Sequence, residues 1–560
     1  MRKIPYRPLA IALAYAFASH AWAQTSDVPL DVIKQDYGNG QYGYRLGINV
    51  GVNGAAPKEY LFDTGSDSFN IDVGLGALQG SSPDWFPNQP GASTGPLQFY
   101  LYGDGTYGYL QSSTTVSSMQ FYDSSSGARV AGFDTSAGAP VAVNYAWVSS
   151  TATGDPVGSI GNVTLKIDTG FQQNLTDGKA PEEGAFYGTF GAGDFGNGVP
   201  GMLTKSGYIV EANGGQGVPG QCGQGCLILG LTPALRAQFL SVVPWSGGAQ
   251  GSFALSGAPS AAQFDTQFVY ALSDGKHTSS AVLPTLFDTG TPNIMLIDNG
   301  VGLADGETTA GHLNPYGDEN PGITLTVTGA AHGALPASIT TGNDASGDYS
   351  NVVTLGPYGG FPSSAIYGIS FIMHNAVMYD LANQSTGYTP FYVTDAPITT
   401  GFTATSAMGP LGLAGTISGT GPLTVAAGGV ANLSGTNTYT GATVVEHGGW
   451  LGLAGPGSIA QSSGAQVDGA LDISRAGQAT ELASLSGGGQ VMLGGDVLML
   501  TQASGNFAGQ LVDGGLSGAG GGGLVVSAGR QQLSGANTYT GTTGVAARGE
   551  LVLTGSLASG

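Results

Sequence analysis

Two copies of the pentapeptide Leu-Phe-Asp-Thr-Gly place two aspartates, Asp63 and Asp288, in matching apolar settings. Two carboxyl groups that share one proton can hydrolyse an amide: the ionised group takes a proton from water while the protonated group donates a hydrogen bond to the carbonyl. Sharing requires that both aspartates lie on rigid turns within hydrogen-bond distance. The glycine after each aspartate permits a tight turn, and the threonine offers a hydroxyl to the opposing loop. We therefore predict that Asp63 and Asp288 form a catalytic pair.

The sequence around each aspartate supports this pairing. An apolar strand precedes each aspartate, and a hydroxyl residue follows each glycine. Further downstream, Ala185–Gly188 (Ala-Phe-Tyr-Gly) and Ala365–Gly368 (Ala-Ile-Tyr-Gly) also correspond, which indicates a duplicated lobe. A third Asp-Thr-Gly begins at Asp168 without the apolar frame, and we interpret it as a turn. The residues predicted to support the pair are Thr64, Gly65, Ser66, Thr289, Gly290 and Thr291.

With these motifs, residues 27–395 resemble the pepsin-like aspartic peptidases, and residues 366–390 resemble the C-terminal signature of that family. The resemblance implies an all-β fold of two β-barrel lobes, with the aspartates in the cleft between them and no cofactor or metal. It also implies that Tyr102, Gly103 and Asp104 belong to a flap that closes over substrate. An ordinary β-hairpin with its turn at Asp104 is the alternative. The family often has a tryptophan where this chain has Asn70.

The first 23 residues and the two cysteines indicate export. Residues 1–23 combine basic residues, a short apolar run and a small-x-small site, which is typical of a secretory signal peptide. In an exported chain, Cys222 and Cys226 are expected to form a small disulfide loop, because two thiols with no histidine nearby cannot complete a zinc site. Lys and Arg total 15 against 37 Asp and Glu, a net charge of -22, which disfavours nucleic acid as a partner.

The composition changes after residue 395. No Cys or Lys occurs from there to Gly560, and residues 433–443 recur as residues 533–543 with nine of eleven positions identical. Each copy is followed by alternating leucines, which a single rung cannot bury, so we predict that rungs stack into a parallel β-helix. This region resembles the repeats of bacterial autotransporter passengers. That family implies an outer-membrane β-barrel, which is not present in this chain, so we expect the sequence to be a fragment.

The predicted organisation is a signal peptide (1–23), a bilobal peptidase (24–395, with a lobe boundary near 230–250) and a repeat region (396–560). The best helix candidate is Leu231–Val243, with Pro233 near its start. We predict a monomeric aspartic endopeptidase, secreted or on the cell surface of a Gram-negative-type bacterium, that acts on polypeptides in acid. One alternative is a catalytically inactive surface or adhesin passenger. Another is a subtilisin-like serine protease using Asp168 and Ala404–Pro410, for which the histidine motif is missing.

Overall fold

The computed structural model describes residues 25–558 with internal gaps. The signal-peptide prediction for residues 1–23 and the flap residues Tyr102, Gly103 and Asp104 therefore lie outside the described residues. The gaps are at 39, 67, 81–82, 87–94, 102–106, 161–162, 194–198, 213, 215–216, 219–221, 246–265, 277, 304–321, 331–335, 343–346, 358–361 and 478.

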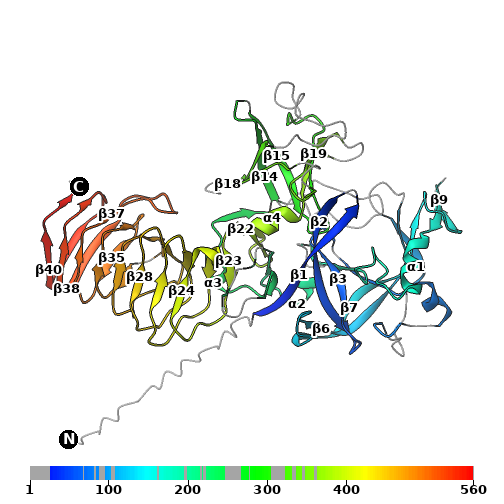
Figure 1. Ribbon diagram of the computed structural model, residues 1–560, viewed down its shortest axis with the longest axis horizontal. Helices are drawn as coiled ribbons and strands as arrows, with labels where there is room; N and C mark the ends of the chain where they lie inside the picture. Colours follow the sequence, from blue (N-terminus) through cyan, green and yellow to red (C-terminus); the bar gives the residue numbers. More distant parts are fainter. Residues whose placement is uncertain are drawn as a thin grey trace, which may run out of the picture.

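The described residues are mostly β-strand, which confirms the predicted all-β class. Figure 1 shows two β-rich bodies at the right and top, and a regular stack of strands, coloured yellow to red, extending from them to the left. Helices in the described residues are short: α1 (Thr169–Thr176), α2 (Val199–Leu203), α3 (Pro233–Ala237) and α4 (Ile369–His374), with 3-10 turns at Leu75–Gln79 and Ser406–Met408.

The N-terminal body is built on one long sheet ordered β13-β22-β21-β11-β12-β1-β2-β3-β10-β4-β7-β6-β5, with β9 beside β7 and β8 beside β9. Strand β1 joins its two halves, because Ser26–Leu30 pairs with β12 and Asp31–Gly38 pairs with β2. Strands from both ends of the two-lobed region therefore meet in one sheet. Its strands are β1 (Ser26–Gly38), β2 (Gln41–Val52), β3 (Lys58–Asp63), β4 (Phe69–Asp72), β5 (Gln98–Leu101), β6 (Tyr107–Tyr122), β7 (Arg129–Ser149), β8 (Pro156–Ile160), β9 (Val163–Ile167), β10 (Thr189–Gly191), β11 (Tyr208–Glu211), β12 (Gly225–Leu229), β13 (Ser241–Pro244), β21 (Ala376–Asp380) and β22 (Ser385–Thr389).

The second body is a seven-stranded sheet ordered β18-β17-β14-β15-β20-β16-β19. Its strands alternate between buried and less buried side chains, as β14 does along its whole length, which is the period of a sheet with one face against a core. Residues 246–265, between β13 and β14, are not described, so the lobe boundary near 230–250 stays a prediction. The strands are β14 (Thr266–Ser273), β15 (Thr278–Phe287), β16 (Ile294–Ile297), β17 (Thr324–Gly329), β18 (Pro336–Thr340), β19 (Val353–Gly356) and β20 (Ser364–Tyr367).

The predicted helix over Leu231–Val243 is shorter than expected. Helix α3 begins after Thr232, whose hydroxyl accepts a hydrogen bond from the Leu235 N–H, and has Pro233 in its first turn. The helix ends at Ala237, and Ser241–Pro244 pairs with β22 as strand β13. The apolar run was therefore a short helix followed by a strand.

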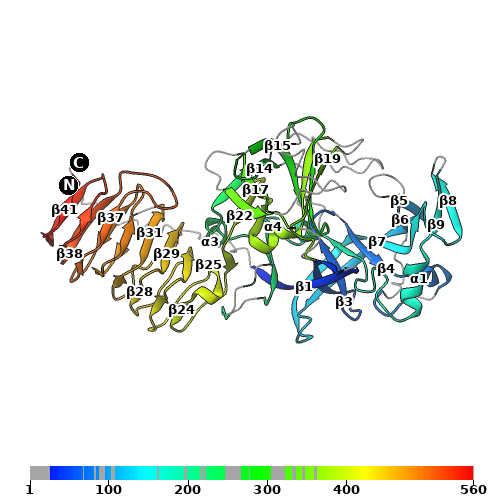
Figure 2. The same cartoon turned by 45° about the horizontal axis from the view of Figure 1, so that its top comes forward.

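The C-terminal residues form parallel sheets in which most strands pair with a strand about twenty residues later (Figure 2). One sheet is ordered β23-β25-β27-β29-β31-β34-β37 and a second β24-β26-β28-β30-β33. The strands are β23 (Tyr392–Thr394), β24 (Phe402–Ala404), β25 (Pro410–Leu413), β26 (Leu423–Val425), β27 (Val430–Leu433), β28 (Thr443–Val445), β29 (Trp450–Ala454), β30 (Ala465–Val467), β31 (Ala470–Arg475), β32 (Thr480–Leu482), β33 (Leu485–Ser486), β34 (Gln490–Met492), β35 (Val497–Leu500), β36 (Asn506–Phe507), β37 (Gln510–Val512), β38 (Gly523–Leu533), β39 (Ala536–Asn537), β40 (Thr543–Leu553) and β41 (Ser556–Leu557).

Apolar side chains of successive strands lie one above another inside this stack. Leu451 pairs with Ala431 on one side and Leu471 on the other, and all three are fully buried. Leu453 is also buried, as the alternation predicted, whereas Leu553 on β40 is 44% exposed. Burial of each row therefore depends on the rows above and below it.

The repeated segment supplies hydrogen bonds between rows. The Asn437 side-chain oxygen accepts from the Ile417 N–H at 2.8 Å, and its amide donates to the Ser458 carbonyl at 3.1 Å. Asn537, at the equivalent place in the second copy, likewise bonds Leu511 N–H and the Ser556 carbonyl. The asparagine of the repeat thus provides hydrogen-bond partners for backbone groups on both sides of its own row.

Candidate active site

Each predicted catalytic aspartate lies at the end of a strand in one of the two sheets. Strand β3 ends at Asp63, and strand β15 ends at Phe287, one residue before Asp288. Each strand has a parallel partner from later in its own lobe: β10 beside β3, and β20 beside β15. These partners are largely buried, so the end of each aspartate-bearing strand is fixed by its neighbours.

The partner strand of the first lobe differs from the prediction by three residues. Ala365–Gly368 does lie beside the second motif, with Tyr367 opposite Phe287. In the first lobe, however, Phe190 pairs with Phe62 and Gly191 with Asp63, so Gly191 and not Gly188 corresponds to Gly368. A Cβ at either of these two glycines would lie within 2.5 Å of a backbone carbonyl, which explains why both positions are glycine.

The structure brings Asp63 and Asp288 together, with a hydrogen bond between their carboxyl groups. One oxygen of Asp63 accepts from the Gly65 N–H at 2.8 Å and the other from the Ser66 hydroxyl at 2.6 Å. Asp288 is held in the same way, by the Gly290 N–H at 2.7 Å and the Thr291 hydroxyl at 2.6 Å. The two carboxyl groups therefore have equivalent settings, and each is oriented by its own loop.

Thr64 and Thr289 join the two loops reciprocally. The Thr64 N–H donates to the Thr289 hydroxyl oxygen at 3.0 Å, and the Thr289 N–H donates to the Thr64 hydroxyl oxygen at 3.0 Å. Each hydroxyl in turn donates to a carbonyl of the opposite strand, Thr64 to Phe287 and Thr289 to Phe62. Both side chains are buried, at 1% and 0% exposure, so the four hydrogen bonds are shielded from water.

The glycines of the two motifs let the carboxyl groups approach. A Cβ placed on Gly65 would lie 2.5 Å from the Asp288 carboxyl carbon, and one on Gly290 would lie 2.6 Å from an Asp63 oxygen. These separations are shorter than real side chains tolerate. Each glycine is therefore required for contact with the opposite aspartate and not only for a turn.

The surroundings of Asp63 favour its protonated form. Burial raises the pKa of Asp63 well above its usual range, and the adjacent Asp288 carboxyl raises it further through repulsion and their mutual hydrogen bond. The Ser66 hydroxyl and the Gly65 N–H act in the opposite direction but do not reverse the shift. Burial and the neighbouring carboxyl thus favour the protonated form of Asp63.

The third Asp-Thr-Gly is separate from this pair. Asp168 is the N-terminal cap of α1, and its side chain accepts from the Gly170 N–H at 2.7 Å. The structure thus gives this motif a local role in starting a helix.

The arms of the predicted flap are present as a hairpin, although Tyr102, Gly103 and Asp104 themselves are not described. Strands β5 and β6 pair antiparallel, with Leu101 opposite Gly108. Asn70, at the position where a tryptophan was expected by resemblance, is buried on β4. The predicted disulfide between Cys222 and Cys226 is present.

Sequence reasoning missed a buried polar group next to the first motif. Asp72, at the end of β4, accepts from the Asn144 side-chain amide at 2.8 Å, and neither residue is exposed. Burial raises the pKa of Asp72 to about 7. An aspartate at the end of a short strand was the only signal, and it has no counterpart in the second lobe, where the strand after the motif is Ile294–Ile297.

Comparisons with known proteins give only distant similarity. No protein-family model and no curated protein matches this chain. Similar solved structures include an aspartic proteinase from Irpex lacteus, with 14% identity over 65% of this chain and 97% of that one, and a TM-score of 0.33. Basic 7S globulin from soybean has 10% identity over 66% of this chain and 96% of that one, also with a TM-score of 0.33. At this level of similarity, function has to be argued from the site itself.

Two further findings concern the described residues alone. They contain no cluster of three or more His, Cys, Asp or Glu side chains placed to hold a metal ion. None of their helices combines the length and apolar character needed to cross a bilayer.

Proposed function

We propose that the two-lobed region is a pepsin-like aspartic endopeptidase that hydrolyses polypeptides in acid. The observation that carries this proposal is the reciprocal setting of Asp63 and Asp288: hydrogen-bonded carboxyl groups, one from each lobe, each oriented by a glycine N–H and a hydroxyl. This is the arrangement that general acid–base hydrolysis by two carboxyl groups requires.

In the proposed reaction, a water molecule binds at the pair. The ionised carboxylate takes a proton from the water as its oxygen attacks the peptide carbonyl, and the protonated carboxyl gives its proton to the carbonyl oxygen. The tetrahedral intermediate then collapses: one of its two hydroxyl groups returns a proton to the pair as the C=O bond re-forms, the C–N bond breaks, the nitrogen gains a proton from the pair, and a carboxylic acid and an amine are released. One water is consumed, and the pair regains its single proton.

The pH dependence follows from the shared proton. As pH rises through the raised pKa of Asp63, this carboxyl ionises and the acid of the pair is lost, so activity falls as pH rises. At sufficiently low pH both groups are protonated and the base is lost. We expect a bell-shaped profile with its maximum in acid.

The test is hydrolysis of an unfolded protein across pH 3 to 8 by the purified chain. We expect cleavage that pepstatin blocks, and Asp63→Asn and Asp288→Asn should each lower kcat by at least about 10³-fold, because either change removes one half of the acid–base pair. Asp168→Asn is the matched control: it alters the third Asp-Thr-Gly, at a helix cap, and should leave kcat nearly unchanged.

Cleavage that persists in Asp63→Asn or Asp288→Asn would overturn the proposal. Inhibition by a serine-directed reagent instead would favour the subtilisin-like alternative. No hydrolysis of any peptide pool by a folded wild-type chain, at any pH tested, would favour the inactive passenger.

We also propose that the C-terminal sheets are a parallel β-helix of the autotransporter passenger type, and that the protein is exported. Parallel pairing at intervals of about twenty residues supports the first proposal. The Cys222–Cys226 disulfide supports export, because such bonds persist in oxidising compartments. N-terminal sequencing of the protein from cell surface and medium tests export, and a start at Gln24 is the expected result.

A further inference from the structure

The strand that leads from the two-lobed region into the C-terminal stack is held by both. Strand β23 follows β22 after a short turn and pairs in parallel with β25, the next strand of the stack. Its residues Tyr392 and Val393 are buried, at 2% and 1% exposure. Whatever holds β23 therefore holds the junction between the two regions.

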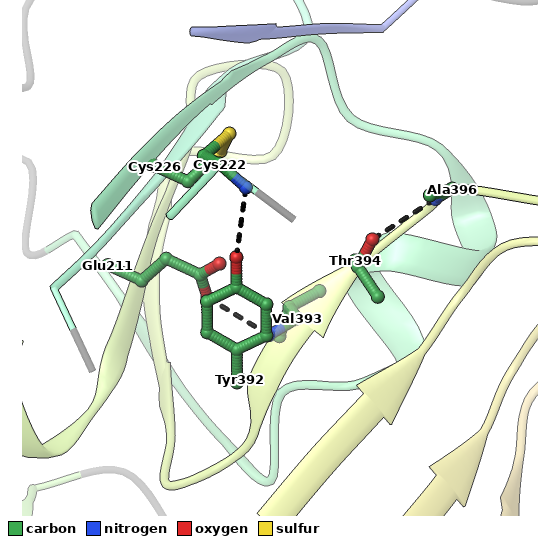
Figure 3. Close-up of a disulfide and its surroundings, with 7 residues drawn as sticks. All are labelled: Glu211, Cys222, Cys226, Tyr392, Val393, Thr394 and Ala396. Carbon is green, nitrogen blue, oxygen red and sulfur yellow. Dashed lines mark hydrogen bonds between the residues drawn. A yellow bond between two sulfur atoms is a disulfide. The ribbon is translucent and has the colours of Figure 1, made fainter. Parts of the chain in front are cut away.

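Two contacts fix β23, one from strand β11 of the long sheet and one from the loop before strand β12 (Figure 3). The carboxyl group of Glu211, on β11, accepts from the Val393 N–H at 3.0 Å. The Tyr392 hydroxyl accepts from the Cys222 N–H at 3.3 Å, within the loop that the Cys222–Cys226 disulfide closes. Figure 3 shows the carboxyl group and the phenol side by side, with the disulfide above them.

Carboxyl groups from three segments gather around this point. Cys226 on β12 lies opposite Glu211 of β11 on one side and next to β1, which carries Asp27, on the other. Asp395 follows β23 directly. The groups that influence one another here are Asp27, Glu211, Tyr392 and Asp395, and none of them is basic.

Two of these carboxyl groups have oxygens without a hydrogen-bond partner among the described residues. They are Oε1 of Glu211, whose side chain is 0% exposed, and Oδ1 of Asp27. An ionised carboxylate in such a place is costly, whereas a protonated carboxyl needs far less compensation. The geometry by itself favours neutral carboxyl groups at the junction.

The pKa shifts agree with this geometry. Burial raises the pKa of Glu211 well above its usual range, and Asp27 adds repulsion, although the Val393 N–H opposes the shift. Burial and the nearby Asp395 raise the pKa of Asp27 to about 7. Both carboxyl groups are thus protonated in acid.

We propose that the junction is an acid-closed latch, in which β23 is held against β11 and the disulfide loop while Glu211 and Asp27 are protonated, and loosens as they ionise. A carboxyl group whose pKa is higher in the closed state stabilises that state fully below its ordinary pKa. This stabilisation is lost as pH rises through the closed-state value. The latch closes in acid and weakens around neutral pH, whether or not the aspartate pair is catalytic.

Hydrogen–deuterium exchange of the full chain between pH 5 and pH 8 tests the latch. The peptide covering residues 389–397 reports on β23, and the peptide covering residues 430–454 in the same molecule is the reference that corrects for the intrinsic pH dependence of exchange. We expect protection of 389–397 relative to the reference to fall at least about tenfold over this range, since each unit of pKa displacement changes the equilibrium tenfold.

Variants distinguish the effect of the two carboxyl groups from a general loss of folding. Glu211→Gln and Asp27→Asn, alone and together, should flatten the pH dependence, with protection in the reference peptide showing that the stack is still folded. Glu481→Gln, on the exposed side of β32, is the matched control and should keep the wild-type dependence. Cys222→Ser with Cys226→Ser should raise exchange of 389–397 at both ends of the pH range, because the loop that holds Tyr392 is then open.

Two results would overturn the latch. One is protection of 389–397 in the wild-type chain that does not change with pH relative to the reference. The other is an unchanged pH dependence in the folded double variant of Glu211 and Asp27. Unaltered protection in the cysteine variant would remove the disulfide loop from the proposal.

Discussion

At the scale of residues, Thr64 and Thr289 connect the two lobes as closely as the aspartates do. A threonine hydroxyl both donates and accepts, and here each one accepts from the opposite N–H and donates to the opposite strand. A single hydroxyl oxygen thus serves both loops at each position. The pairing of the carboxyl groups therefore depends on two buried hydroxyls whose hydrogen bonds connect the two loops.

Thr289→Val should loosen the pair. The valine leaves the buried Thr64 N–H and the Phe62 carbonyl without partners, at a cost of about 2 to 5 kcal/mol in the free energy of unfolding. Because the loops then shift relative to each other, kcat for acid hydrolysis should fall at least about tenfold. Urea denaturation and steady-state kinetics measure the two effects.

Two companion variants make this result specific. Thr289→Ser keeps the hydroxyl and should recover most of the stability and activity. Thr324→Val, at an exposed position of β17, makes the same chemical change where no buried group depends on it. Wild-type kcat in Thr289→Val would show that the cross-connection does not position the pair.

At the scale of elements, sequence resemblance located the strands of the site but not all of their registers. The two Leu-Phe-Asp-Thr-Gly segments predicted equivalent strands, and β3 and β15 are equivalent. The match of Ala185–Gly188 to Ala365–Gly368 was wrong by three residues. It was chosen because the two segments share identical residues. Hydrogen bonding instead selects Phe190 and Gly191, since Gly191 packs on the Ser66 and Ser68 carbonyls just after Asp63.

The stack shows a similar limit. The sequence revealed a repeat at a spacing of one hundred residues, whereas the strands pair at about twenty. Only two rows contain the full Asn-Thr-Tyr-Thr-Gly segment. The rows between them also have buried apolar side chains, but their residue types differ. Apolar packing tolerates different side chains, so the shorter period leaves little trace in the sequence.

Asn437→Ala should weaken the stack locally. The buried Ile417 N–H and the Ser458 carbonyl lose their partner, so we expect a loss of about 2 to 3 kcal/mol in the stability of the stack. Gln466→Ala, an exposed change on β30, should cost less than about 0.5 kcal/mol. Guanidinium denaturation followed by circular dichroism compares the two variants, and equal stabilities would contradict the role assigned to Asn437.

At the scale of the whole molecule, helix α3 attaches the two-lobed region to the flank of the stack. The Gln238 amide donates to the Asn432 carbonyl at 3.0 Å and the Ser434 hydroxyl at 2.7 Å, and its oxygen accepts from the Asn432 side chain at 2.8 Å. Gln238 is 0% exposed. These partners are 194 and 196 residues away in the sequence, and no sequence pattern in either segment predicts the contact.

This docking predicts that the two regions unfold together. Differential scanning calorimetry of the wild-type chain at pH 5 should give one transition. Gln238→Ala removes the hydrogen bonds to Asn432, whereas Ser434 still donates to the Ala234 carbonyl, and should move the transitions of the two regions apart, because the coupling between the regions is weakened. Gln531→Ala is the matched comparison: this glutamine is equally buried and donates to the Leu485 carbonyl, but it lies within the stack. It should lower the stability of the stack and the midpoint temperature, while the chain still unfolds in a single transition.

Two transitions in the wild-type chain would show that the two regions unfold independently although they are in contact. One unchanged transition in Gln238→Ala would show that Gln238 does not couple them.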